Sequence, residues 1–516
     1  MNAQLAEAFT RLPAYLGGHV AVSVTALLLG LAISLPLALI ATRRPTLRNV
    51  LLGVASVVQT IPSLALLALF YPLLLGLAAL CERTFGAGFS ALGFLPSVLA
   101  LTLYSMLPVL RNTVTGLNGI EPAIQEAALG VGMTRRQSLT MVELPLAMPV
   151  IMAGIRTAAI WVVGAATLST PIGQTSLGNY IFTGLQTQNW VFVLFGCAAA
   201  AVFALAVDQL LALMEVGLTR RKRTWVTAGG LGLALLTLGA LVPTLSQPRA
   251  TTTIGAKPFA EQYVLAALIE QRLRDSGLSA ATREGLGSAV IFNALRAGEI
   301  DAYVDYSGTI WTNQMQRTDV KPRAEVLSET AAWLAREHKI KMLGGLGFEN
   351  AYALAMPRAR AQALGIRTLA DLAGRAQNLS IAGDYEFFGR PEWDAVRKTY
   401  GIGFREQRQM QAEFMYAAVA NGEVDVIAGY TSDGRIAQRD LIVLDDPRHA
   451  IPPYDAVLLI SPKRVNDATL IAALQPLVDA IDVTLMREAN LRASGDRNAS
   501  PGEAARWLWN EISKKR

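Results

Sequence analysis

Long apolar runs fill the first half of this 516-residue chain and are scarce in the second half. About 20 consecutive apolar residues suffice for a helix to cross a bilayer, and about six runs in residues 1–248 reach that length. These runs lie near residues 17–41, 50–80, 91–110, 148–171, 190–216 and 225–245. The sequence therefore predicts an all-α polytopic membrane domain, followed from residue 252 by a domain with charges throughout.

The first two runs each raise a question about the membrane domain. The first run could be a cleaved signal peptide, but it is too long and is followed by Arg43-Arg44 rather than by small residues. We therefore expect it to be a retained span. The second run contains Pro62, which lacks an amide donor, so a kink or break is expected there.

Basic residues mark the cytoplasmic side of a membrane protein. They follow the first, third and fifth runs as Arg43, Arg44 and Arg48, then Arg111, Arg135 and Arg136, then Arg220, Arg221, Lys222 and Arg223. The short segments on the other side contain only Arg11 and Arg83. This pattern predicts a multi-pass protein of the cell (inner) membrane whose N-terminus and C-terminal domain are both extracytoplasmic.

Residues 126–145, EAALGVGMTRRQSLTMVELP, form the predicted cytoplasmic loop before the fourth run. Glu, Ala and Leu favour a helix, Gly permits a bend, and Pro marks the start of a new segment. We therefore expect a short helix, a break and a second short helix. The defining positions are Glu126, Ala127, Ala128, Gly132, Leu144 and Pro145. An ordinary amphipathic loop is the alternative.

The spacing of this segment resembles the EAA loop of ABC-importer permeases, with Val142 in place of the usual Ile. The resemblance implies that these six positions receive force from a separate cytoplasmic ABC ATPase. The dipeptide Gly-Lys is absent, so the chain has no Walker A loop. We therefore expect the partner subunit to use the ATP and this chain to hold no cofactor.

Strand-like and helix-like segments alternate through residues 252–516, which predicts an α/β architecture with mainly parallel sheets. Four segments resemble the binding proteins of osmoprotectant ABC importers. They are IGAKPFAEQ at 254–262, DYSGT at 305–309, GYTSDG at 429–434 and PPY at 452–454. The resemblance implies a fused permease and periplasmic-binding-protein-like domain with two lobes, the second near 353–452.

The predicted domain limits follow from these patterns. They are 1–224 for the permease domain, 225–251 for the sixth span and a linker, and 252–516 for the solute-binding domain. The linker itself is expected at 246–252. The resemblance also implies two permease copies side by side, hence a homodimer in the lipid bilayer.

Ligands of the family are quaternary amines such as glycine betaine, choline and carnitine. A quaternary ammonium has no N–H donor, so aromatic faces hold it, each contributing about 0.5–2 kcal/mol. Tyr306, Tyr352, Tyr430 and Tyr454 lie at predicted strand ends, where α/β domains place ligands. They match the family's cage positions. A half-buried core tyrosine is the alternative for each.

A betaine also carries a carboxylate. The matching family positions are Lys257 and Arg390, and Arg390 can dock a carboxylate bidentately. Thr309 can add a hydroxyl bond. The alternatives are surface charges or, for Arg390, a salt bridge to Glu386 or Glu392. If both cations point into the pocket, a zwitterion is favoured over choline.

Other function classes find little support. The net charge of +6 reflects the cytoplasmic cluster at 220–223, and no basic patch with interleaved aromatics predicts nucleic-acid binding. Three scattered histidines show no metal spacing, and no catalytic motif occurs, so no metal and no enzyme activity are expected. Asp208 and Glu215 are expected to pair with a neighbouring helix or a basic loop. A role in the translocation path is their alternative.

Three alternatives to glycine betaine import remain open. Ergothioneine or choline could be the cargo of the same architecture. A membrane-tethered sensor that binds ligand without transport is the third, although such a sensor would have no use for a complete EAA loop.

Overall fold

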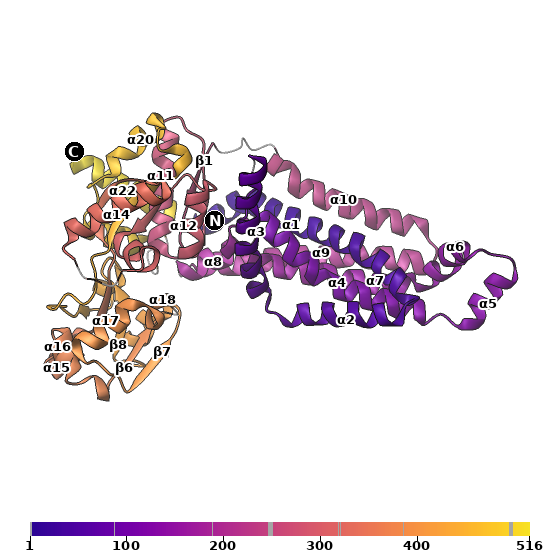
Figure 1. Cartoon of the computed structure of the whole chain (residues 1–516), viewed down its shortest axis with the longest axis horizontal. Coiled ribbons are helices and arrows are strands. Elements are labelled where there is room, and N and C mark those ends of the chain that lie inside the picture. The colour runs from indigo at the N-terminus through magenta and orange to yellow at the C-terminus, as the bar shows by residue number, and fades with distance from the viewer. Residues whose placement is uncertain are drawn as a thin grey trace. The chain divides into compact units, whose positions relative to one another are not determined.

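The computed structural model describes residues 3–86, 88–187, 189–245, 251–317, 319, 321–384, 386–494 and 499–515. The chain divides into a helical unit within residues 1–248 and an α/β unit that is mainly residues 249–516 (Figure 1). Residues 246–250 of the predicted linker lie outside the described residues.

The helical unit is built from long apolar helices joined by short ones. The long helices are α1 (Ala3–Thr42), α2 (Pro45–Thr60), α3 (Ser63–Phe85), α4 (Phe94–Asn118), α7 (Leu144–Ala166), α9 (Trp190–Thr219) and α10 (Arg223–Leu245). The short ones are α5 (Pro122–Gly130), α6 (Arg135–Ser138), η1 (Leu139–Glu143), η2 (Thr167–Ile172) and α8 (Gly178–Gln186). Among the described residues, six segments are long and apolar enough to cross a membrane. The prediction of a multi-pass membrane domain is confirmed.

The predicted break in the second run is present. Helix α2 ends at Thr60 and α3 begins at Ser63, with Ile61 and Pro62 between them. Only Ser63–Phe85 has the length and hydropathy of a span, so the predicted range of 50–80 was placed too early. Pro62 separates the two helices because its ring prevents the continuous hydrogen-bond ladder that one long helix needs.

Helix α4 packs against both α1 and α7. Gly154 of α7 shows how close the contact is, because a Cβ there would lie 2.8 Å from the carbonyl oxygen of Pro108 and 2.6 Å from the Cβ of Asn112. The three helices therefore form the centre of the unit, and apolar side chains on α3, α9 and α10 remain exposed at its surface.

The α/β unit contains two five-stranded sheets, ordered β2-β1-β3-β10-β4 and β7-β6-β8-β5-β9. The strands are β1 (Thr252–Gly255), β2 (Ala280–Arg283), β3 (Ala302–Tyr306), β4 (Lys341–Glu349), β5 (Tyr352–Pro357), β6 (Ser380–Gly383), β7 (Glu406–Gln409), β8 (Val426–Tyr430), β9 (Leu441–Val443) and β10 (Asp455–Ile460). The main helices are α11 (Ala260–Asp275), α12 (Ser288–Ala297), α14 (Arg323–His338), α17 (Pro391–Tyr400), α18 (Ala412–Ala420), α21 (Val483–Ala493) and α22 (Pro501–Lys515).

The prediction of mainly parallel sheets was wrong. Among the described strands, four pairs are parallel and four are antiparallel. The antiparallel pairs arise where the chain changes sheets. It leaves the first sheet after β4, enters the second at β5, and returns at β10. Both β5 and β10 pair antiparallel with their neighbours on both sides, which gives an α/β unit of two sheets joined by two connections.

Candidate ligand-binding site and coupling loop

The segment at 126–145 folds as a helix, a break and a second helix, as predicted. Helix α5 carries Glu126, Ala127 and Ala128 and ends at Gly130. Gly132 follows with φ +85°, a left-handed conformation that a side chain would resist. The short helix α6 carries Arg135. The π-helical turn η1 then leads into α7, whose first two residues are Leu144 and Pro145.

This loop presents a mixed apolar and basic surface. Leu129 is 49% exposed, Val131 76% and Met141 64%. Arg135 and Arg136 are exposed between them, whereas Ala128 is buried. Exposed apolar side chains gathered on one short segment are typical of a protein-protein contact.

Sequence reasoning missed the capping box that fixes the second helix. The Thr134 hydroxyl accepts the backbone N–H of Gln137, and the Gln137 side chain accepts the backbone N–H of Thr134. The signal was present in the sequence as Thr, two residues, then Gln.

In the α/β unit, three of the four predicted tyrosines come together. Tyr352 opens β5 and stands opposite Tyr430 at the end of β8. Their ring centroids are 5.1 Å apart, and the ring of Tyr454, just before β10, lies 6.2 Å from Tyr352 at 89°. Phe387, which sequence reasoning did not select, lies 5.1 Å from Tyr352. We call Tyr352, Tyr430, Tyr454 and Phe387 the aromatic cluster.

Tyr306 has a different environment. Its hydroxyl donates to Glu261 at 2.6 Å and accepts from the Gln262 amide at 3.0 Å. The Lys257 ammonium lies 5.4 Å from its ring centroid, and Phe259 stacks on it at 6.2 Å. Among the described residues, the Tyr306 ring stacks on Phe259 and on no ring of the aromatic cluster, so its predicted cage role stays a prediction.

Glu261 is the centre of a buried polar network around Tyr306. Besides the Tyr306 hydroxyl, it accepts bonds from Asn350 at 3.0 Å, Ser432 at 2.6 Å and Asn490 at 2.7 Å. Burial raises the pKa of the Glu261 carboxyl, and these four bonds oppose that shift only in part. The network joins α11 to the connection between the two sheets.

Lys257 and Thr309 are both buried, so the alternative of a surface charge at Lys257 is wrong. The Lys257 ammonium lies 2.5 Å from one carboxylate oxygen of Asp305. The other carboxylate oxygen of Asp305 accepts a hydrogen bond from the Tyr303 hydroxyl at 2.5 Å. Thr309 follows Gly308, where a Cβ would lie 2.5 Å from the Tyr454 ring. The predicted ligand contacts of Lys257 and Thr309 stay predictions.

Arg390 touches the aromatic cluster and also forms the salt bridges weighed as its alternative. Its guanidinium carbon is 5.1 Å from the Tyr352 ring centroid, and one nitrogen donates to the Tyr454 hydroxyl at 3.4 Å. Two nitrogens reach the Glu392 carboxylate at 3.2 Å, and another reaches Glu386 at 3.2 Å. Its predicted bond to a ligand carboxylate stays a prediction.

Asp384, the first residue after β6, also contacts the aromatic cluster. The Tyr430 hydroxyl donates to its carboxylate, and the Tyr352 hydroxyl lies at 3.5 Å. Its second oxygen accepts the backbone N–H groups of Glu386 and Phe387 at 2.9 and 2.7 Å. The sequence signal was an aspartate directly after a strand, where α/β folds place ligand contacts.

Asp208 and Glu215 of α9 both pair with Arg156 of α7, at 2.9 and 2.8 Å. The expectation that they pair with a neighbouring helix is confirmed. Sequence reasoning overlooked Arg156 itself, although a basic residue inside an apolar run demands a partner.

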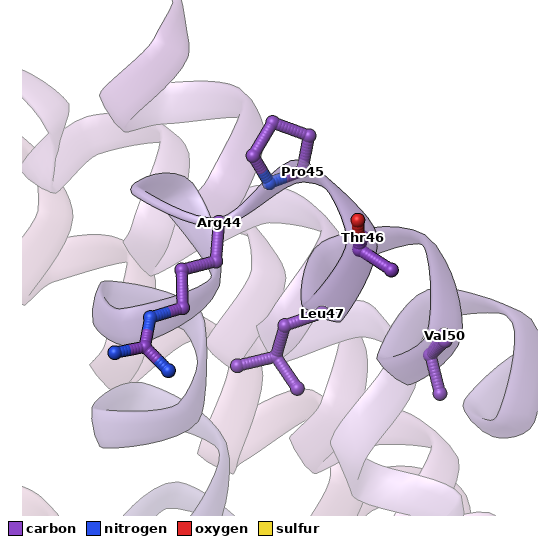
Figure 2. A pocket seen from close by; sticks show the side chains of 5 residues that line it. All are labelled: Arg44, Pro45, Thr46, Leu47 and Val50. Carbon is purple, nitrogen blue, oxygen red and sulfur yellow. The ribbon is translucent and has the colours of Figure 1, made fainter.

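A separate surface depression lies at the start of α2. It is lined by Arg44, Pro45, Thr46, Leu47 and Val50 (Figure 2). None of these is a predicted ligand-binding residue, and the depression offers no aromatic face for a quaternary ammonium. The aromatic cluster therefore remains the candidate ligand site.

Two family models match the chain. The substrate binding domain of the ABC-type glycine betaine transport system matches residues 250–511. The binding-protein-dependent transport system inner membrane component matches residues 34–223.

Several known proteins are similar. The ergothioneine transport permease/ergothioneine binding protein EgtU of Helicobacter pylori (strain G27) is 30% identical over 437 residues, covering 80% of this chain and 74% of that protein. The choline transport system permease protein OpuBB of Bacillus subtilis (strain 168) is 39% identical over 201 residues, covering 39% of this chain and 85% of that protein. The crystal structure of a glycine betaine/carnitine/choline ABC transporter is 25% identical in sequence, with a TM-score of 0.46. The match covers 51% of this chain and 98% of the chain in that structure.

These matches cover both units of the chain in one polypeptide. The protein is a multi-pass membrane transporter component and is not itself an enzyme. The chain belongs to the ABC-importer family in which an inner-membrane permease is fused to the substrate-binding domain of glycine betaine transport systems.

Proposed function

We propose that this chain is the membrane-spanning and solute-binding subunit of an ATP-driven importer for quaternary ammonium compounds, the class that includes glycine betaine and choline. The aromatic cluster carries this proposal. Its rings come from both sheets of the α/β unit, with Tyr352 and Tyr430 in the second and Tyr454 next to the first. Aromatic faces that converge from two sheets suit a cation with an apolar surface and no N–H donor.

The charges at the cluster support the same ligand class. Asp384 accepts the Tyr430 hydroxyl, and Glu392 accepts the Tyr454 hydroxyl. A phenol that donates to a carboxylate keeps an electron-rich ring, and the Asp384 carboxylate also attracts a positive ligand directly.

Transport by this chain requires a separate ATPase. The exposed surface of α5, Val131 and Met141 is the proposed docking site of a cytoplasmic ABC ATPase, which would supply all ATP chemistry. Two copies of the chain are proposed to form the translocation path as a homodimer. The N-terminus and the α/β unit are proposed to be extracytoplasmic, because the basic loops then face the cytoplasm.

Ergothioneine is the second candidate ligand. The Helicobacter pylori relative, whose similarity extends over 80% of this chain, is named for ergothioneine transport and binding. Ergothioneine is a betaine of histidine, so its trimethylammonium group presents the same chemistry to the aromatic cluster, while its ring needs additional space.

Calorimetry on the full-length chain in lipid nanodiscs tests the proposal with glycine betaine, proline betaine, carnitine, choline and ergothioneine. At least one should bind. Replacing Tyr352 and Tyr430 together by Ala should weaken that binding about tenfold or more, because each lost ring removes about 0.5–2 kcal/mol of cation–π attraction.

Replacing the same two tyrosines by Phe is the matched control. It keeps both rings and removes only the hydroxyl groups, so most of the affinity should remain. Failure of all five ligands to bind, or equal affinity of the wild type and the double Ala variant, would show that the aromatic cluster is not a quaternary-ammonium site.

A further inference from the structure

Glu392 is a buried carboxylate in the first turn of α17, and neither the family resemblance nor the aromatic pattern selected it. It accepts two bonds from Arg390, one from the Thr312 hydroxyl at 3.1 Å and one from the Tyr454 hydroxyl. Thr312 and Tyr454 adjoin the first sheet, whereas Arg390 adjoins the second. Glu392 therefore bonds to a cation next to the second sheet and to a cluster tyrosine next to the first sheet.

The first consequence concerns the charge of Arg390. Its guanidinium is buried, lies over the Tyr352 ring and contacts the Tyr454 hydroxyl. Without a buried counter-charge, it would repel the ammonium group of a ligand at the same rings. Glu386 also contacts Arg390, but it is 60% exposed, so water screens its charge. Glu392 is thus the buried group that neutralises Arg390.

Glu392 keeps its charge at neutral pH. Burial alone would raise the pKa of its carboxyl, but the positive charge of Arg390 and the bonds from Arg390 and Tyr454 outweigh burial, so the pKa lies below its usual value. The location in the first turn of α17 adds the favourable end of the helix dipole.

The second consequence concerns Asp384. Once Glu392 has neutralised Arg390, the carboxylate of Asp384 remains beside Tyr352 and Tyr430. In the part of the chain that the structure describes, no lysine or arginine side chain forms a salt bridge with it. The aromatic cluster therefore carries one uncompensated negative charge, which attracts a ligand of net charge +1 more strongly than a zwitterion.

From this arrangement we infer that Glu392 is a specificity-determining positioning residue. It acts through Arg390 and Tyr454. Its charge gives the aromatic cluster a higher affinity for choline-like cations than for betaines that carry a carboxylate. The inference rests on the proposed function, because it assumes that the aromatic cluster binds a quaternary ammonium. The sequence favoured a zwitterion only if Lys257 and Arg390 both point into the pocket, and this inference takes the opposite preference because both cations have buried carboxylate partners.

The test compares the dissociation constants of choline and glycine betaine for the full-length chain in nanodiscs. The wild type should bind choline more tightly. Glu392→Gln keeps the shape of the side chain and leaves the charge of Arg390 uncompensated. It should shift the choline to glycine betaine preference toward glycine betaine by on the order of tenfold to a hundredfold. A purely structural role would instead weaken both ligands in parallel.

Two further variants make the test decisive. Arg390→Gln combined with Glu392→Gln removes both charges and should restore the wild-type preference. Glu386→Gln removes the exposed partner of Arg390 and should shift the preference far less than Glu392→Gln, because solvent screens that pair. Glu392→Asp keeps the charge and should keep the preference for choline, even if Glu392→Gln fails to fold.

The outcomes separate this inference from the proposed function. A wild type that binds neither ligand nor the other quaternary amines contradicts the proposed function. A wild type that prefers glycine betaine, or an unchanged preference in Glu392→Gln, or a parallel loss of both ligands overturns the role of Glu392 alone.

Discussion

Buried charged residues in the α/β unit occur in small groups whose members satisfy one another. Lys257 pairs with Asp305, and Arg390 pairs with Glu392. Glu261 differs, because its four bonds come from a phenol, a hydroxyl and two amides, all of them neutral donors. A buried carboxylate held only by neutral donors keeps a large desolvation cost when ionised.

That difference predicts how stability depends on pH. The folded state raises the pKa of Glu261 above its ordinary value of 4.5, so the folded state binds this proton more tightly than the unfolded state. This tighter proton binding stabilises the folded state fully below about pH 4.5, and the stabilisation is lost as pH rises through the folded-state pKa of Glu261. Glu261→Gln removes this titration. The stability of the wild type relative to the variant should therefore decrease as pH rises from about 4.5 to 8.

Thermal unfolding of the full-length chain across that pH range, followed by tryptophan fluorescence, checks this expectation. Glu423→Gln, at an exposed glutamate, is the matched control for the substitution itself. A stability difference between the wild type and Glu261→Gln that is constant with pH would show that Glu261 does not titrate differently on unfolding.

The chain positions of the site residues were more predictable than their contacts. Motif spacing located Tyr352, Tyr430 and Tyr454, because each lies at a strand end that the alternation of strands and helices reveals. The partners of these rings could not be predicted. Glu392 meets Tyr454 across 62 residues of sequence. Such a contact depends on how two sheets pack, and no local pattern in the sequence encodes that packing.

At the scale of elements, the loop between α4 and α7 was predicted well because its signals are local. Residues that favour a helix, a glycine that permits a bend and a proline that starts a new segment each affect the backbone conformation of only a few neighbouring residues. The strand directions were predicted poorly for the opposite reason. The buried strand β10 is apolar in every residue after Asp455, and such an apolar run looks the same whether its neighbours are parallel or antiparallel.

Gly132 permits a test of the coupling loop with an internal control. Its φ of +85° disfavours any side chain, although no atom would lie within 4 Å of a Cβ there. Gly132→Ala therefore strains only the backbone, by about 1–2 kcal/mol. Gly130 also has open space around a Cβ but no positive φ, so Gly130→Ala adds the same methyl group without strain.

We expect Gly132→Ala to reduce ligand uptake several-fold in proteoliposomes that contain the ATPase, and Gly130→Ala to reduce it much less. Ligand affinity of the full-length chain should be the same in both variants, since the aromatic cluster lies in the α/β unit. Equal uptake by the two variants would show that the bend at Gly132 does not matter for coupling.

At the scale of the whole molecule, fusion places a solute-binding unit and a permease unit in one polypeptide. Fusion raises the effective concentration of the binding unit at its own permease, because a short tether confines it nearby. If two chains form the translocation path, each assembly then contains two binding units and two coupling loops. Such an assembly needs only one functional binding unit, since a single loaded unit can deliver a ligand. It needs both coupling loops, since opening a path between two permeases requires force on both.

Mixed assemblies test this stoichiometry. Wild-type chains are reconstituted one to one with a coupling-defective variant, Glu126→Lys, or with the binding-defective variant in which Tyr352 and Tyr430 are Ala. Random pairing gives about one quarter wild-type dimers and about one half mixed dimers. Uptake should fall to about one quarter with the coupling-defective chain and to about three quarters with the binding-defective chain. Uptake near one half in both mixtures would mean that each chain works alone, and the proposed homodimer would be wrong.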